Sequence, residues 1–150
     1  MTLLEMVIAM AILAVLATAI VPLAEVTVQR TKELELRRDL RTIRTALDEY
    51  KADYDKAVTE KKIIASVDES GYPEELQVLL EGDDWGGLYP YKRKYLRRIP
   101  SDPFDVNDDG WGLRAYADDY DSTVWGGRDI YDVYSQSEKM GLDGTPYSSW

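Results

Sequence analysis

Glu5 is the ionisable residue with the least usual surroundings in this sequence, because it stands at the edge of a long apolar segment. Residues 6–24 carry no charge, and the first basic residue is Arg30. In a membrane-spanning helix an acidic group costs on the order of 2.5–3.5 kcal/mol at the centre and less near an end, so it favours a cationic partner. The α-amine of Met1 is poorly placed on the same short turn, and that of a neighbouring subunit is better placed. Glu5 therefore predicts an assembly contact; reaching lipid headgroups is the alternative.

A second group of side chains offers oxygen ligands to a metal ion. Asp105, Asn107 and Asp109 alternate along the chain, and Gly110 stands at the sixth position, as in the opening of a calcium-binding loop. The twelfth position is Tyr116 instead of Glu, so the EF-hand pattern fails. An acidic turn explains the run about as well as a calcium site.

The chain lacks the commonest catalytic residues, since it contains no Cys and no His. It therefore has no thiolate nucleophile, no disulfide and no imidazole base. No pair of carboxylates stands out as a catalytic dyad, so we expect a protein that is not an enzyme. The formal net charge of −10 also argues against nucleic acid as a partner, because nucleic-acid-binding domains are usually basic.

The apolar segment predicts a retained membrane-spanning helix. As a helix, residues 6–24 would be roughly 28 Å long, close to the ~30 Å hydrocarbon core of a bilayer. A cleavable secretory signal would have a basic start and a shorter apolar core, and neither is present. Pro22 lies inside the segment, removes one backbone donor and favours a kink or local melting.

The same helix is predicted to continue well beyond the membrane, over about residues 2–56 and roughly 80 Å. Charged residues at helical spacing, Glu33 with Arg37 and Arg44 with Asp48, are expected on its outer faces. One apolar stripe, which we expect to pack on a small domain, is formed by Leu36, Leu40, Ile43, Leu47, Tyr50 and Tyr54.

The remaining sequence predicts an α+β domain. A short helix is expected to begin at Tyr72-Pro73 and to stop near Gly82. Three strands are predicted over residues 111–116, 122–125 and 129–135, because aromatic and β-branched residues alternate there with turn signals. These strands predict a small antiparallel sheet that packs against the long helix. We therefore divide the chain into a membrane half of the helix, residues 1–25, and a globular domain, residues 26–150.

The first residues resemble a known family. Residues 1–6, Met-Thr-Leu-Leu-Glu-Met, are similar to the start of mature type IV pilins and type II secretion pseudopilins. In that class a leader is removed before the first residue, the new amine is methylated, position 5 is Glu and position 22 is commonly Pro. Glu5 and Pro22 match in register, whereas Met1 replaces the usual Phe.

A second stretch narrows the resemblance. Residues 94–104, with Pro100, Asp102, Pro103 and Phe104, are similar to the run "basic, aliphatic, Pro, any, Asp, Pro, aromatic" of the G-type major pseudopilins. In those proteins the run follows a short helix and leads into the sheet. The segment between residues 51 and 72 is longer here than the connection usual in the family.

The resemblance implies the type IV pilin fold and a structural subunit that polymerises into a helical pseudopilus for protein export by type II secretion. It implies processing and methylation at Met1 by a prepilin peptidase, and pairing of Glu5 with the amine of the preceding subunit. The implied partners are further copies of the chain, the inner membrane, the secretion platform with its ATPase, minor pseudopilins and the secretin. The implied location is the bacterial inner membrane, in a single pass with the C-terminal domain in the periplasm. The assembled filament would lie in the periplasm or extend outside the cell.

The resemblance also implies a calcium site near the C-terminus, in an Asp-Gly loop after the last strand. Residues 141–145 occupy the matching place and make Asp143 a candidate ligand. The further acidic residues that the family carries before the final Trp are replaced by Pro-Tyr-Ser-Ser at 146–149. An ion-free turn is therefore the alternative.

Charge is unevenly distributed along the chain. Residues 92–98 hold five basic side chains, whereas residues 101–150 hold eleven acids and three bases, a local balance of −8. In a filament of identical subunits, complementary patches of this kind would set the register between neighbours. Two solvated faces are the alternative.

Two other functions remain open. The chain could be a type IV pilin of a surface filament used for adhesion or motility, although many such pilins close a C-terminal loop with a disulfide and this chain has no Cys. It could instead be a membrane-anchored binding module that uses its aromatic and acidic surface, given four Trp and eleven Tyr.

Overall fold

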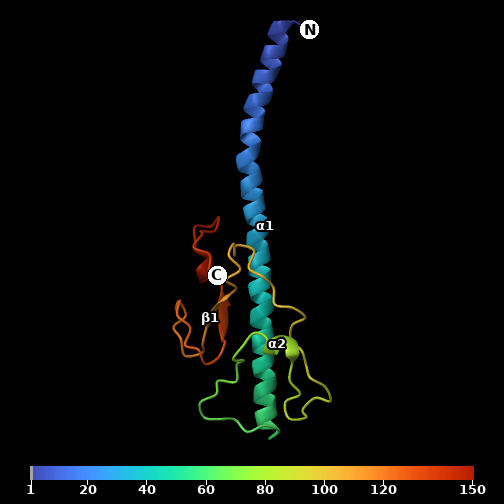
Figure 1. Cartoon of the computed structure of the whole chain (residues 1–150), viewed down its shortest axis with the longest axis vertical. Coiled ribbons are helices and arrows are strands. Elements are labelled where there is room, and N and C mark those ends of the chain that lie inside the picture. Colours follow the sequence, from blue (N-terminus) through green and yellow to red (C-terminus); the bar gives the residue numbers. More distant parts are fainter. Residues whose placement is uncertain (1) are drawn as a thin grey trace.

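A single helix, α1, runs from Leu3 to Thr59 and determines the shape of the molecule. The computed structural model describes residues 2–150, apart from the side chains of residues 19 and 21. At ~1.5 Å per residue, α1 is a rod about 86 Å long. Figure 1 shows its first half standing free and the rest of the chain lying along its second half. The long helix predicted over residues 2–56 is confirmed, and it extends three residues further.

The predicted apolar stripe forms the core. Leu36, Leu40, Ile43 and Leu47 are at most 2% exposed. They pack against residues from all parts of the C-terminal chain, namely Leu79, Leu96, Phe104, Trp111, Ile130, Val133 and Tyr147. Burying one Leu or Ile side chain contributes roughly 1.5–3 kcal/mol, so this stripe is what holds the C-terminal part on α1.

The sheet has two antiparallel strands among the described residues, β1 (Gly112–Arg114) and β2 (Asp132–Tyr134), with Leu113 opposite Val133. Together with α1 this confirms an α+β layout. The third strand predicted over residues 122–125 is wrong, because residues 123 and 124 form a bend and none of the four belongs to a strand. The Asp118 carboxylate accepts N–H groups from Ala115, at 2.7 Å, and Gly126, at 3.0 Å, so it ties the two ends of this loop together.

The short helix also differs from the prediction. α2 spans only Val78–Glu81 and is capped by Gly82, so it stops where expected. It begins five residues after Pro73, later than predicted. The Pro73 carbonyl accepts the N–H of Ile130 at 2.7 Å, so the chain at Pro73 is attached to the segment before β2 and does not yet turn into a helix. One turn of 3₁₀-helix, η1 (Tyr147–Ser149), completes the fold.

Pro22 lies within α1, and the helix is continuous on both sides of it. Of the two effects that Pro22 favours, a kink or local melting, the described helix of the single chain shows no melting. Proline has no N–H to donate to the carbonyl of Thr18, so one helical hydrogen bond is missing there. The Thr18 hydroxyl donates to the Val15 carbonyl at 2.7 Å, one turn earlier.

Candidate functional site

The first half of α1 is an exposed apolar surface. Its most apolar 18-residue window has a mean hydropathy of 2.7, and none of that window is buried by the rest of the chain. Leu3, Leu13 and Leu16 are 57–82% exposed. By length and composition this helix could cross a membrane. An apolar surface of this size requires lipid or protein around it.

Glu5 is held at the start of this surface by a capping box with Thr2. The Thr2 hydroxyl oxygen accepts the Glu5 N–H at 3.3 Å, and Glu5 Oε2 accepts the Thr2 N–H at 3.4 Å. Within residues 2–150 no Lys or Arg pairs with Glu5. The predicted processing site, Met1, lies outside the described residues. The sequence Thr2-Leu3-Leu4-Glu5 carries the capping-box signal, which our sequence analysis missed.

Polar residues spaced four apart on α1 hold the C-terminal segment. Glu33 is 8% exposed, and its Oε1 accepts the Leu142 N–H at 2.8 Å and the Tyr147 hydroxyl at 2.9 Å. Gln29 donates to the same oxygen at 3.2 Å and to the Met140 carbonyl at 3.2 Å. Among the described residues Gln29 is the first of α1 whose side chain bonds to the C-terminal part.

Arg37, one turn after Glu33, binds the loop that contains Asp143. Its Nη2 lies 3.1 Å from Asp143 Oδ2, and its guanidinium carbon lies 4.1 Å from the centre of the Trp150 ring. Asp143 Oδ1 accepts the N–H of Thr145 at 3.0 Å and its hydroxyl at 2.6 Å. The Trp150 Nε1–H donates to the same hydroxyl oxygen at 2.6 Å. Hydrogen bonds from Thr145, and then the charge of Arg37, lower the pKa of the Asp143 carboxyl.

This arrangement does not fit a calcium ion at Asp143. Calcium takes six to eight oxygen ligands. Both oxygens of Asp143 already accept donors, and one of the donors is a cation. Within residues 2–150, no three acidic side chains come together as a metal-binding group.

Arg44 and Arg114 fasten the strands and the C-terminal residues to each other. Arg44 Nε lies 2.6 Å from Asp132 Oδ1, and Arg44 Nη2 donates to the Trp150 carbonyl at 2.7 Å. Arg114 Nη2 donates to the Ser148 carbonyl at 3.2 Å. The charged pairs expected along α1, including Arg44 with Asp48, are therefore not the ones that form. Glu33, Arg37 and Arg44 bond to the C-terminal half instead.

The other calcium candidate closes its own turn. Asp105 Oδ1 accepts the Asn107 N–H at 3.0 Å, and Oδ2 accepts the Gly110 N–H at 2.8 Å. Backbone hydrogen bonds lower the pKa of the Asp105 carboxyl, and the one from Gly110 has the largest effect. The Asn107 side chain donates to Asp109 Oδ2 at 3.3 Å, within the same turn. The geometry is that of an acidic turn.

A buried carboxylate that the sequence analysis missed anchors residues 83–95 to α1. Asp53 is 5% exposed and accepts the hydroxyls of Tyr89, at 2.8 Å, and Tyr95, at 2.7 Å. Arg93 Nη1 lies 2.9 Å from the same carboxylate. Burial, and then the hydrogen bond to Asp53, raise the pKa of the Tyr95 hydroxyl. All the donors to Asp53 come from one loop, so the cluster is an attachment point.

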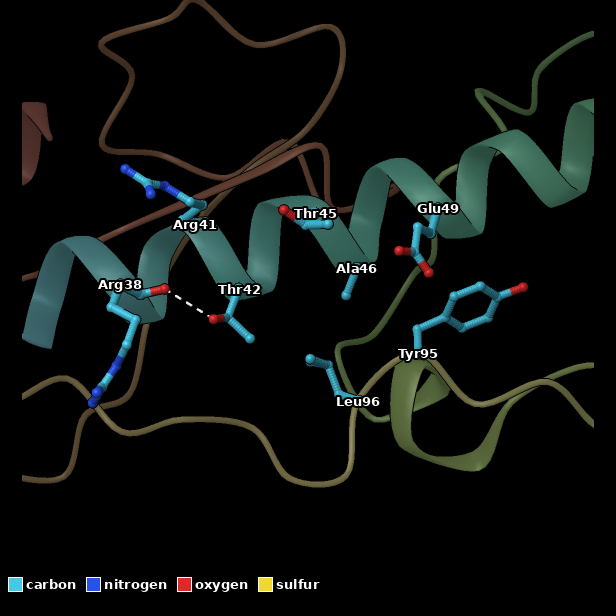
Figure 2. Close-up of a pocket in the computed structure, with 8 residues that line it drawn as sticks. All are labelled: Arg38, Arg41, Thr42, Thr45, Ala46, Glu49, Tyr95 and Leu96. Atoms are coloured by element: carbon cyan, nitrogen blue, oxygen red, sulfur yellow. Dashed lines mark hydrogen bonds between the residues drawn. The ribbon is translucent and has the colours of Figure 1, made fainter.

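Two shallow grooves flank an uncovered ridge of α1 at Arg41 and Thr45. One, of about 330 Å³, lies between α1 and Tyr95-Leu96; Figure 2 shows Ala46 and Leu96 facing one another across it. The other, of about 460 Å³, is bounded by Arg37, Arg44 and Trp150 among others. Most charged residues along both grooves already have protein partners, so neither presents an assembled set of catalytic groups.

A scan against protein-family models and searches of curated proteins and of solved structures each returned no match for this chain.

Proposed function

We propose that this chain is a structural subunit of a pilin-like filament, of the pseudopilin kind that drives protein export by type II secretion, with the type IV pilin fold. The observation that carries the proposal is the division of α1 into two halves with opposite surfaces. The first half is bare and apolar, and the second is covered by its own α+β part. A soluble subunit could not leave the first half in water.

The bare half of α1 has two successive environments in this proposal. Before assembly it lies in the inner membrane, since its length matches the hydrocarbon core. After assembly it packs against the same half of other copies in the centre of the filament. Both environments bury the apolar side chains that the monomer exposes. One helix can therefore serve as membrane anchor and as polymerisation element.

Glu5 supplies the specificity of assembly in this proposal. Its position at the tip of α1 places a carboxylate in an apolar setting, where an unpaired charge is costly. The N-terminal amine of the preceding copy would neutralise it, and pairing offsets a desolvation cost of several kcal/mol per ion. A subunit in the wrong axial register would leave both charges unpaired.

The distribution of charge supports contacts between unlike faces. Lys92, Lys94, Arg97 and Arg98 are exposed, and within residues 2–150 none of them forms an ion pair. The acidic loop after β1, residues 118–121, lies across α1 from the segment that carries these bases (Figure 1). A repeated head-to-tail contact uses two different patches of each subunit, and opposite charges on opposite sides suit it.

Deleting the gene tests this function. We expect exported proteins to accumulate in the periplasm and to return to the medium in the complemented strain, because without the filament they no longer pass the outer membrane. Comparing the extracellular and periplasmic proteomes of the two strains measures this. Unchanged export together with lost surface fibres or motility would instead assign the chain to the type IV pilins. Unchanged export with fibres intact would favour the membrane-anchored binding module.

A further inference from the structure

The C-terminal loop, residues 140–145, is attached to α1 through two carboxylates of different surroundings. Glu33 is buried and satisfies the N–H of Leu142 from the α1 side. Asp143 is 46% exposed and lies on the loop itself. Glu33 is satisfied by donors of the protein itself, so Asp143 is the carboxylate at which a metal ion or a basic side chain would stand.

Arg37 occupies that place. It follows Glu33 by one helical turn, so both project from the same face of α1. Its guanidinium bonds to Asp143 and lies over the Trp150 ring, whose own N–H reaches the Thr145 hydroxyl. Arginine suits such a position because its flat group can bond a carboxylate and stack on an aromatic ring together. The loop, the terminal Trp150 and α1 are thus joined through one side chain.

We infer that Arg37 is the cation of this loop, and that the chain closes residues 140–150 onto α1 without a divalent metal ion. The Arg37 guanidinium binds the carboxylate that a calcium ion would need, and the Trp150 indole stacks on this guanidinium. Folding of this segment is then independent of calcium concentration. The inference concerns the folded single chain and does not depend on the proposed filament.

The salt bridge alone contributes little, and this sets the size of the expected effect. The Arg37 and Asp143 side chains are 54% and 46% exposed, so solvent screens the attraction between them. A guanidinium stacked on indole also contributes little at an exposed site. Removing Arg37 should therefore open the loop locally. The buried apolar stripe of α1 should stay packed, because other residues cover it.

Amide hydrogen exchange of the full chain in detergent micelles tests this inference. In the wild type we expect the same protection at Leu142 and Thr145 in calcium chloride and in chelator. Arg37→Gln should raise exchange at these amides roughly fivefold or more, because the exposed pair with Asp143 and the stacking on Trp150 are lost together. Arg37→Lys keeps the charge without the flat group and should fall between the two.

Arg41→Gln is the matched control, because Arg41 is exposed on the same helix and does not bond to the loop. It should exchange like the wild type. Greater protection of the wild type in calcium, or lower protection in chelator, would overturn the inference. So would wild-type exchange rates in Arg37→Gln.

Discussion

At the scale of single residues, the carboxylates of this chain are best understood from the donors that surround them. Asp105 and Asp118 close turns by accepting backbone N–H groups. Asp53 gathers three donors from one loop while almost fully buried. Asp143 combines a hydroxyl, a backbone N–H and a guanidinium. Each carboxylate either closes a turn or attaches a piece of irregular chain to the rest of the fold.

The lowered pKa of Asp143 predicts how the loop responds to acid. A carboxyl with a folded-state pKa below its usual 3.8 stabilises the fold above that pH, and the contribution is lost as pH falls through the lower value. We expect the difference in unfolding temperature between wild type and Asp143→Asn to be constant above about pH 5 and to shrink in stronger acid. Thermal melts from pH 7 downward measure it. A difference that grows in acid would contradict the sign.

Asp53 predicts a larger effect on stability. Replacing it by Asn keeps the shape but weakens its bond to Arg93 and leaves one tyrosine hydroxyl without its acceptor. We expect a loss of about 1–3 kcal/mol in the free energy of unfolding, the cost of unsatisfied buried donors. Urea unfolding in micelles measures it. Asp55→Asn, at an exposed position one turn from Lys51, should change stability far less.

At the scale of elements, α1 is one continuous helix with two kinds of surface. Leu47 is 0% exposed within the core, whereas Leu16, on the bare half, is 57% exposed. Replacing Leu by Ala at each of the two positions therefore separates the part of the helix that stabilises the globular part from the part that does not. The two halves need different partners, although they share one backbone.

Leu47→Ala should lower the free energy of unfolding of the globular part by about 2–5 kcal/mol, because it leaves a cavity in the core. Leu16→Ala should leave that free energy unchanged, since nothing in the folded chain covers Leu16. Chemical unfolding followed by near-ultraviolet circular dichroism, with the chain in micelles, compares them. Equal losses would mean that the bare half packs on the globular part, contrary to the structure.

The elements also show how far the sequence could predict the fold. α1 and its buried stripe were predictable because helical periodicity is a local signal repeated over many turns. The strand at residues 122–125 was predicted from β-branched and aromatic residues between turn signals. The side chain of Asp118, which holds the ends of that loop, decides otherwise. Likewise Pro73 favours a helix start locally, but its carbonyl is bonded to Ile130, 57 residues away.

The sequence predicted the positions of the candidate site residues better than it predicted their hydrogen-bond partners. The sequence singled out Glu5 as one charge in an apolar run, and the spacing of Thr2 and Glu5 also indicated the capping box that the structure shows. For Glu33 and Arg37 the spacing of four residues equally suits a pair along the helix. Their actual partners, Leu142 and Asp143, are more than 100 residues away in the sequence. A pattern along one helix carries no information about such partners.

At the scale of the whole molecule, the exposed apolar half of α1 and the opposed charges of the globular part are both incomplete in a single copy. The first needs an apolar environment, and in the proposed filament the second would meet patches of opposite sign. A membrane alone satisfies only the first. A helical filament of identical subunits satisfies both, which is why assembly is the centre of the proposed function.

The most direct test of that proposal compares filament formation by two variants, Glu5→Gln and Thr2→Ala, in the source bacterium. Membrane fractionation locates the subunits, and electron microscopy counts the filaments. Gln can still accept the capping bond but has no charge, whereas Thr2→Ala weakens the cap and keeps the charge. We predict that Glu5→Gln is inserted and folded but forms no filaments, and that Thr2→Ala assembles nearly as well as the wild type. Normal filaments from Glu5→Gln would contradict the account.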